Sequence, residues 1–459
     1  MRIFLRAGKM PTEVIDPFTT IRRNVTGTNI GNMLFQQSVA KSLSLPDYDV
    51  RAYGLDLRPS LVDWINDECD MLVLPFANQF RPEFSDRLDI MATTIRKLKV
   101  PVTVVSIGCQ TNAEYDYSNL NSIKVSAKRF ISAVLDKSAV IGVRGDCTAG
   151  YVRSLGFRDV EVIGCPSMFM NGATLASPRA IRDFDGDTRI STNISAVGGQ
   201  AAFSTGFDRM GESISLANAR YRDVDYIPQE NRSILDLLLA KDSEQTEHHA
   251  MRAETYEALH KRGNVTSFVD PRTWFEHLAT RQFVYGTRLH GNIAGLLSGT
   301  PAHLLAHDSR TVELADYHHI PYTRMDAFSE KEDPRELYER SDYTEMTSNH
   351  RDRFETYAGF LRKNGLKNVF SDGDSGSQFE QQLQSAALPE AIRSISPDNE
   401  IRKRLIWGAQ SSAAQSRDVE AARKASTLSA QGYRAMLKLR RSTASILKRQ
   451  SRSVHKIVR

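Results

Sequence analysis

Two side chains that can bind an anion and move a proton stand close together in the middle of the chain. Arg288 and His290 follow the apolar run Gln282–Tyr285, which predicts a buried strand, and they precede Gly291. Thr287 is expected to cap the helix that opens there, which places both side chains in its first turn. Backbone N–H groups and the positive end of the helix dipole then face a ligand beside a fixed guanidinium. The pattern predicts an anion-binding site that carries one titratable group.

The helix that begins at this site has glycines along one face. Gly291, Gly295 and Gly299 recur every four residues, so a strand or a ligand can approach that backbone closely. The helix N-terminus is also expected to lower the pKa of His290 and to keep its ring neutral until an anion arrives. His290 is therefore the predicted catalytic group, and Gly291 is a predicted contact to the substrate.

Three more polar side chains, Arg144, Arg310 and Asn78, come shortly after other runs that are predicted as strands. Ligands of open parallel sheets bind at the carboxyl ends of the strands, where such side chains gather. Arg144 and Arg288 are therefore expected to face each other across a cleft. A salt bridge is the alternative for Arg144, and an ion-pair network with its neighbours is the alternative for Arg310.

The elements that must position these residues follow the pattern of βα units. The first third of the chain contains the apolar runs Met71–Phe76, Val100–Ile107, Ala139–Val143 and Val160–Ile163. A second set contains Arg189–Val197, Val224–Ile227, Val265–Val269, Gln282–Tyr285 and Ala302–Ala306. The polar stretch Ala176–Thr188 between the sets reads as a linker. The predicted fold is α/β, with two doubly wound Rossmann-like units that face a cleft in a GT-B-like arrangement.

These runs divide the chain into an N-terminal unit, residues 1–175, and a second unit with the anion site and closing helices, residues 189–370. Residues 371–459 are predicted to form a linker and a basic helical tail, since no acidic residue follows Glu420. Its basic and apolar residues suggest peripheral contact with an anionic membrane surface. A helix packed on the body or on a second subunit is the alternative. Nucleic-acid binding is not predicted, because no recognition module is present.

Composition excludes several other classes of protein. The chain has 459 residues with 41% hydrophobic and 25% charged residues, which indicates folded domains over most of its length. No secretory signal or membrane-spanning run is visible, so a cytoplasmic protein is expected. Its four cysteines lack paired spacing, and no dinucleotide or P-loop motif is present, so neither a metal nor a cofactor is predicted.

The predicted site residues belong to a longer succession of motifs. Arg288-Leu289-His290-Gly291 is followed by Gly299-Thr300-Pro301 and by His307-Asp308-Ser309-Arg310. Earlier in the chain stand a strand that ends at Arg144 and the turn Asn29-Ile30-Gly31-Asn32. In order and spacing, this succession resembles the polysaccharide pyruvyl transferase family over roughly residues 25–325. Three positions depart from the family: Asn32 and Cys165 stand where Asp is common, and Arg310 stands where Lys is usual.

The resemblance implies an enzyme that moves pyruvate from phosphoenolpyruvate onto a saccharide, free or lipid-linked, and forms a ketal. Holding the phosphate and carboxylate of such a donor requires several cations at close range, for which Arg144, Arg288 and Arg310 are the candidates. Asn78 is expected to line the acceptor side. Two alternatives stay open, a nucleotide-sugar-dependent glycosyltransferase and a non-catalytic polysaccharide assembly protein, because a fold alone does not define an activity.

Overall fold

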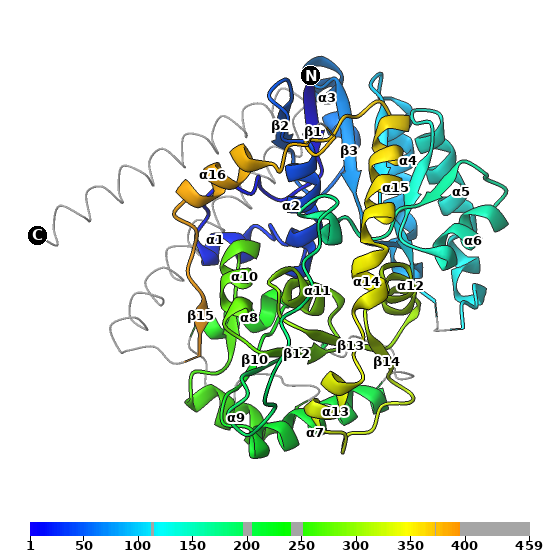
Figure 1. Cartoon of the computed structure of the whole chain (residues 1–459). Coiled ribbons are helices and arrows are strands. Elements are labelled where there is room, and N and C mark those ends of the chain that lie inside the picture. The colour runs from blue at the N-terminus through cyan, green and yellow to red at the C-terminus, as the bar shows by residue number, and fades with distance from the viewer. Residues whose placement is uncertain (112–113, 196–203, 240–250, 372, 395–459) are drawn as a thin grey trace, which may run out of the picture.

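The computed structural model describes residues 1–111, 114–195, 204–239, 251–371 and 373–394. Figure 1 shows two α/β units, one above the other, each built on a parallel sheet with helices around it. The predicted α/β class with two Rossmann-like units is confirmed. The basic tail that was predicted from residue 421 onward lies outside the described residues.

The first unit contains a parallel sheet in the order β2-β1-β3-β5. Its strands are β1 (Arg2–Leu5), β2 (Asp49–Ala52), β3 (Met71–Pro75) and β5 (Val102–Val105). A parallel bridge between Ile107 and Val143 continues the sheet to β7 (Ile141–Val143), which pairs with β8 (Val160–Val162). Two short strands, β4 (Asn78–Phe80) and β6 (Gly108–Cys109), pair beyond the ends of β3 and β5. The helices are α1 (Pro17–Arg22), α2 (Gly31–Ser42), α3 (Val62–Glu68), α4 (Ser85–Arg96), α5 (Lys124–Leu135) and α6 (Asp146–Ser154).

Every residue of β3 and β5 is buried, as expected for strands that helices cover on both faces. These are the continuous apolar runs that the sequence shows. The edge strand β2 alternates exposed and half-buried residues instead, and its polar sequence explains why no strand was predicted there.

The second unit contains a parallel sheet in the order β10-β9-β12-β13-β14. Its strands are β9 (Ile190–Asn193), β10 (Val224–Tyr226), β12 (Phe283–Gly286), β13 (Ala302–Ala306) and β14 (Tyr322–Arg324), with the short β11 (Thr266–Ser267) beside it. The helices are α7 (Ser204–Arg220), α8 (Asn231–Leu238), α9 (Ala253–Lys261), α10 (Pro271–Ala279), α11 (Leu289–Leu297), α12 (Ser309–His318), α13 (Pro334–Glu339) and α14 (Thr344–Ser348).

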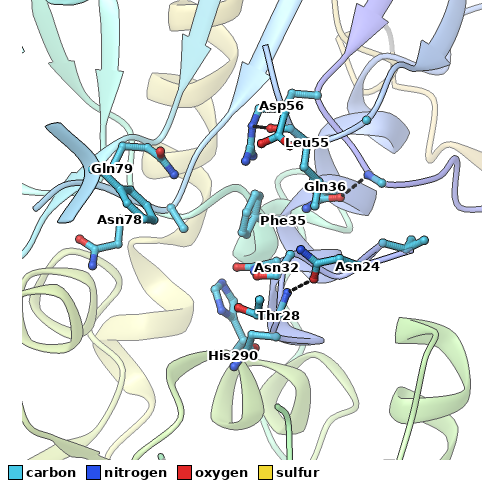
Figure 2. A pocket seen from close by; sticks show the side chains of 18 of the residues that line it. Asn24, Thr28, Asn32, Phe35, Gln36, Leu55, Asp56, Asn78, Gln79 and His290 are labelled. Atoms are coloured by element: carbon cyan, nitrogen blue, oxygen red, sulfur yellow. Dashed lines mark hydrogen bonds between the residues drawn. The ribbon is translucent and has the colours of Figure 1, made fainter. Parts of the chain in front are cut away.

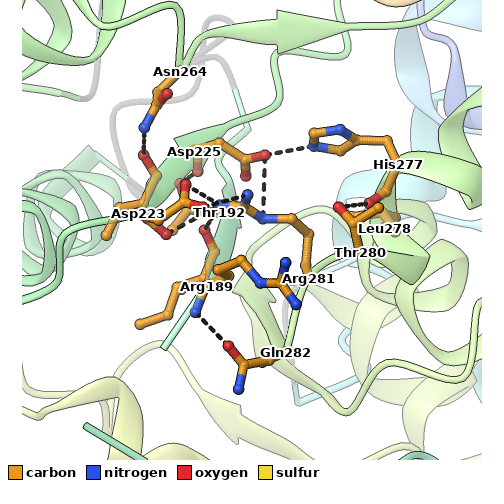
Figure 3. Close-up of polar contacts among 12 residues, drawn as sticks. Arg189, Thr192, Asp223, Asp225, Asn264, His277, Leu278, Thr280, Arg281 and Gln282 are labelled. Carbon is orange, nitrogen blue, oxygen red and sulfur yellow. Dashed lines mark hydrogen bonds and ion pairs between the residues drawn. The ribbon is translucent and has the colours of Figure 1, made fainter. Parts of the chain in front are cut away.

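A buried ionic network stabilises the second sheet away from the carboxyl ends of its strands (Figure 3). Arg281, just before β12, pairs with Asp223 at 2.8 Å and donates to the carbonyl of Ile190. His277 Nε2 lies 2.5 Å from Asp225, whose pKa stays low because Arg281 and His277 outweigh the effect of burial. These charges pair with one another at the end of the sheet away from the cleft, so we assign them to the structure and not to the chemistry.

The chain returns to the first unit after the second sheet, which differs from the predicted boundary at residue 370. Helix α15 (His350–Lys363) buries Phe354, Tyr357 and Leu361 against the first-unit core, where β1 and β3 supply the partners. Helix α16 (Ser377–Ser385) begins inside the segment that was predicted as a spacer. Strand β15 (Ile392–Arg393) then pairs with β11, so the described end of the chain joins both units. Among the described residues, no helix combines the length and apolar character that crossing a bilayer requires.

One buried ion pair connects the two units beside the cleft. Lys9 Nζ lies 3.0 Å from an Asp270 carboxylate oxygen, and the two side chains are 3% and 0% exposed. Lys9 also donates to the Glu13 carbonyl, and Asp270 caps α10 by accepting from the Arg272 N–H. Because both charges are out of water, each depends on the other.

Replacing Lys9 by methionine is expected to destabilise the protein by about 3–5 kcal/mol, because Asp270 then stays buried without its cation. Lys261→Met is the matched control, since Lys261 is 72% exposed and pairs with Glu257 on the helix surface. That change should have little effect on stability. Urea unfolding of both variants measures the difference, and equal losses would contradict the structural role of Lys9.

Candidate active site

The two units enclose a cleft of about 1080 Å³ at the carboxyl ends of their strands. Its walls come from both sequence halves and include Asn32, Asn78, Arg144, Arg288 and His290. Figure 2 shows His290 at one end, Phe35 in the middle, and Leu55 and Asp56 at the other end. Eight arginines line the cleft, namely Arg6, Arg23, Arg58, Arg81, Arg87, Arg144, Arg288 and Arg310, against the two carboxylates Glu13 and Asp56. The cleft is therefore strongly cationic.

Arg144 directly follows β7 and is held by the ends of the neighbouring strands. Its Nε donates to the Ser106 carbonyl at 3.1 Å, and its Nη2 lies 3.5 Å from the Phe76 carbonyl. The aliphatic part of the Arg144 side chain packs closely on Gly108, because a Cβ added there would lie 2.8 Å from Arg144 Cδ. Only 3% of Arg144 is exposed, and burial lowers its pKa. The predicted strand-end cation thus lies in the cleft in a fixed orientation.

No carboxylate within the described part of the chain forms an ion pair with Arg144. The nearest candidates come from the second unit. Asp308 is occupied by Arg310 and caps α12 by accepting from the Thr311 N–H. Burial raises the pKa of Glu313 to about 8, so this carboxyl is mostly neutral at pH 7 while it accepts from Thr148 at the start of α6. The charge of Arg144 therefore stays available to an anionic ligand.

Arg310 lies across the cleft from Arg144, in the first turn of α12. Its Nε donates to Asp308 at 2.7 Å, so the ion-pair alternative holds for this residue. Although burial alone would raise the pKa of Asp308, Arg310 and His307 lower it to about 2. Arg310 also lines the cleft, so the pair presents a guanidinium whose position is set by Asp308.

Arg288 caps α11 in place of Thr287, which corrects the predicted boundary. Thr287 is occupied elsewhere, because its hydroxyl accepts from the Ser195 N–H at 2.8 Å. The Arg288 N–H donates to Asn193 Oδ1 at 2.8 Å, and the guanidinium pairs with Glu230. Within the described residues, no side-chain hydrogen bond caps α11 at Arg288. The first N–H groups of a helix have no intrahelical partner, so the anion site predicted there stays a prediction.

His290 lies in the first turn of α11, and its ring reaches the first unit. Its Nε2 is 3.6 Å from the buried Cys165 Sγ, and its ring centroid is 5.8 Å from that of Phe35. An added Cβ on Gly31 would lie 2.8 Å from His290 Cβ, so this close approach requires a glycine. Burial, reinforced by the charges of Arg144, Arg310 and Arg288, lowers the pKa of His290 to about 3. The imidazole is neutral at physiological pH in the empty cleft.

The other two predicted residues have mainly supporting positions. Gly291 is buried beneath the cleft surface, where an added Cβ would lie 2.5 Å from Gln229 and 2.8 Å from Asn193 side-chain nitrogens. Asn78 lines the cleft, but its amide nitrogen donates to Gln110 Oε1 at 2.5 Å. Its oxygen has no hydrogen-bond partner within the described residues, which leaves one acceptor for a ligand.

Sequence reasoning missed Asn193, which positions a residue of the cleft. Asn193 ends β9 and accepts from the Arg288 N–H, and its place at a strand end was the signal that could have found it. Asn32 donates to the carbonyls of Thr26 and Gly27. An Asp carboxylate at residue 32 could not donate these hydrogen bonds. Asn32 therefore has a structural role, since it holds the turn before α2.

Known structures of related architecture were compared with the chain. The UDP complex of S. aureus MnaA is 9% identical, with a TM-score of 0.37 over 85% of this chain and 98% of that one. The Methanocaldococcus jannaschii UDP-GlcNAc 2-epimerase is 10% identical, with a TM-score of 0.37 over 84% and 99% of the two chains. The Streptomyces nogalater glycosyltransferase SnogD is 10% identical, with a TM-score of 0.30 over 77% and 94%.

No curated protein sequence matches the chain. The model of the family described as polysaccharide pyruvyl transferase, however, matches residues 29–309, which is more than half of the sequence and includes Arg144, Arg288 and His290. The chain therefore belongs to the polysaccharide pyruvyl transferase family.

Proposed function

We propose that the chain transfers pyruvate from phosphoenolpyruvate to two hydroxyls of a saccharide, forming a ketal and releasing phosphate. One observation supports this most strongly. Arg144, which has no carboxylate partner among the described residues, lines the same cleft between the two units as His290, a neutral histidine at an uncapped helix start. Such an arrangement suits a small donor that carries two anionic groups and needs a proton.

The donor is proposed to bind between Arg144, Arg288 and Arg310. Its phosphate and carboxylate would supply Arg144 with a counter-ion and would add charge-assisted contacts to Arg288 and Arg310, which already pair with Glu230 and Asp308. The N–H groups of α11 would add hydrogen bonds. Bound anions also oppose the three arginines that lower the pKa of His290. Donor binding therefore raises the basicity of the imidazole when the acceptor is to be deprotonated.

The proposed reaction balances with His290 as the proton carrier. The imidazole accepts the proton of the first saccharide hydroxyl and returns it to the methylene carbon, which becomes a methyl group. The hydroxyl oxygen bonds to the central carbon of the donor. The second hydroxyl then bonds to the same carbon as the carbon–oxygen bond to phosphate breaks, and its proton leaves with the phosphate. The scheme needs neither a metal nor an organic cofactor.

The proposed acceptor is a saccharide of a polysaccharide or glycoconjugate precursor, and a lipid-linked form is included in this proposal. The cleft extends well beyond the three arginines of the donor end. Asn78 Oδ1 and Gln79 Oε1 are acceptors in its wall that lack a hydrogen-bond partner among the described residues. Saccharide hydroxyls can donate to such oxygens.

The test is to incubate the full chain with phosphoenolpyruvate and a panel of saccharides and to measure phosphate. The account expects phosphate release that requires both substrates, with one ketal formed per phosphate. A parallel incubation replaces phosphoenolpyruvate by nucleotide sugars. Release of nucleoside diphosphate there, without phosphate release from phosphoenolpyruvate, would support the glycosyltransferase alternative and contradict the proposal.

A further inference from the structure

The cleft has a second cationic end, which the donor does not need. Its volume of about 1080 Å³ slightly exceeds the upper end of the roughly 300–1,000 Å³ pockets that hold whole drug-sized ligands, so a small donor fills only part of it. Three of the lining arginines, Arg58, Arg81 and Arg87, come from the first unit between β2 and α4 and are not part of the donor cluster.

These three arginines share one carboxylate among the described residues. Arg58 lies 2.8 Å from Asp56, and Arg87 lies 3.2 Å from the other oxygen of the same side chain. Arg87 also donates to the Leu55 carbonyl at 3.1 Å. Arg6 adds a further guanidinium beside them, because it donates to the same carbonyl at 2.8 Å. The lining of this end of the cleft is therefore cationic.

Arg81 is the central group of this cluster. No described carboxylate forms an ion pair with it, and its Nε is buried without a hydrogen-bond partner within the described residues. The guanidinium carbon lies 3.7 Å from the ring centroid of Phe84, which fixes the plane of the fork. Burial lowers the pKa of Arg81, and the positive charges of Arg310 and Arg87 lower it further. These guanidinium groups therefore repel one another. An anion placed here relieves that repulsion.

The cluster and the donor end lie on different parts of the cleft. Figure 2 places Asp56 and Leu55, which hold Arg58 and Arg87, at the end opposite His290, with Phe35 between them. Arg81 follows Asn78 and Gln79 in the chain and lines the cleft with them, and the buried amide oxygens of these two residues lack a hydrogen-bond partner among the described residues. The charges of both Arg310 and Arg87 act on Arg81. A ligand that extends from the donor end would have its saccharide near these amides and its charged part at Arg81 and Arg87.

We propose that Arg81 and Arg87, with Arg58 at the rim, form a second anion subsite that binds the diphosphate of a diphosphate-linked saccharide acceptor. This inference rests on the proposed function and specifies its acceptor class. A diphosphate offers several anionic oxygens to these neighbouring guanidinium groups, whereas a single sugar carboxylate offers one charge. Planar guanidinium forks also fit phosphate oxygens in pairs. Nucleoside and lipid carriers share this chemistry.

The kinetic test compares the full wild-type chain with Arg81→Gln at varied acceptor concentration. Arg96→Gln is the matched control, because Arg96 is an exposed arginine at the end of α4. Arg81→Gln is expected to raise KM about ten- to hundredfold for a nucleoside-diphosphate saccharide or a short-chain lipid-diphosphate saccharide. KM for phosphoenolpyruvate should stay unchanged. Preference for one acceptor over the other identifies the carrier.

Two kinetic results would overturn the proposal. A rise in KM for phosphoenolpyruvate alone would place Arg81 in the donor site, and equal KM values for the free saccharide and its diphosphate form would remove the subsite. Calorimetry with inorganic pyrophosphate tests the subsite even if no turnover occurs. Binding lost in Arg81→Gln but kept in Arg144→Gln supports it. Binding that depends on Arg144 alone, or no binding to wild type, contradicts it.

Discussion

Replacing His290 by glutamine will lower kcat for ketal formation by about 10²–10⁴-fold, the range that a positioned acid–base group contributes. Glutamine keeps the size and a hydrogen-bonding end but cannot carry a proton between hydroxyl and methylene. KM for phosphoenolpyruvate should change little, because the arginines hold the donor. Steady-state phosphate release at saturating donor measures both quantities. His319→Gln is the control, since His319 lies at the end of α12 and is not among the residues that line the cleft.

The pH profile gives a second readout of His290. Its pKa of about 3 means that the ring is neutral throughout pH 5–8 and gains a proton only as pH falls through about 3. Wild-type kcat/KM for the donor should therefore show no acidic limb from His290 above pH 5. A kcat/KM that instead falls as pH rises through about 6, with this fall absent in His290→Gln, would show that the free enzyme uses a protonated ring, and it would contradict the proposed carrier role.

The second large effect concerns Arg144. Arg144→Gln is expected to lower kcat/KM for phosphoenolpyruvate by about ten- to hundredfold, because a charge-assisted hydrogen bond contributes about 1.5–3 kcal/mol. The loss should appear mainly in KM. Direct binding of phosphoenolpyruvate by calorimetry checks the assignment without turnover.

Two further variants separate charge from structure at this position. Arg144→Lys retains the charge but not the planar guanidinium group that contacts the Ser106 and Phe76 carbonyls. Its affinity for the donor should therefore lie between those of wild type and Arg144→Gln. Arg153→Gln removes an exposed arginine from α6 and should leave kcat/KM unchanged. If Arg144→Gln binds the donor as tightly as wild type while both proteins show the same thermal unfolding, Arg144 does not hold the donor.

The apolar strands were predictable because a strand that is buried on both faces has mostly apolar residues along its whole length. β3, β5, β12 and β13 are buried along their whole length, and each appears in the sequence as a continuous apolar run. The edge strand β14 was missed, since its three residues are all half-buried and read as polar. Strand existence follows from composition where the run is apolar, and not at the polar edge strands β2 and β14.

Errors at the site came from contacts between residues far apart in sequence. Thr287 is a residue type that often caps helices, but its hydroxyl accepts from the Ser195 N–H. Asn193 instead accepts from the N–H of the next residue, Arg288. The apolar stripe of α15 was visible as a helical pattern, yet nothing local shows that it packs on β1 and β3. The placement of His290 beside Cys165 likewise depends on the meeting of two units. Local pattern selected the candidate residues, and tertiary packing determines how they are held.

The central claim is that the chain protonates the donor's methylene carbon and builds a ketal. The most direct measurement is a single-turnover reaction of the full chain with phosphoenolpyruvate and a competent saccharide in deuterium oxide, followed by NMR of the product. The account predicts one deuterium in each pyruvyl methyl group and one phosphate per ketal. A product that keeps the vinyl methylene, or a saccharide that stays unmodified while phosphoenolpyruvate is consumed, would contradict it.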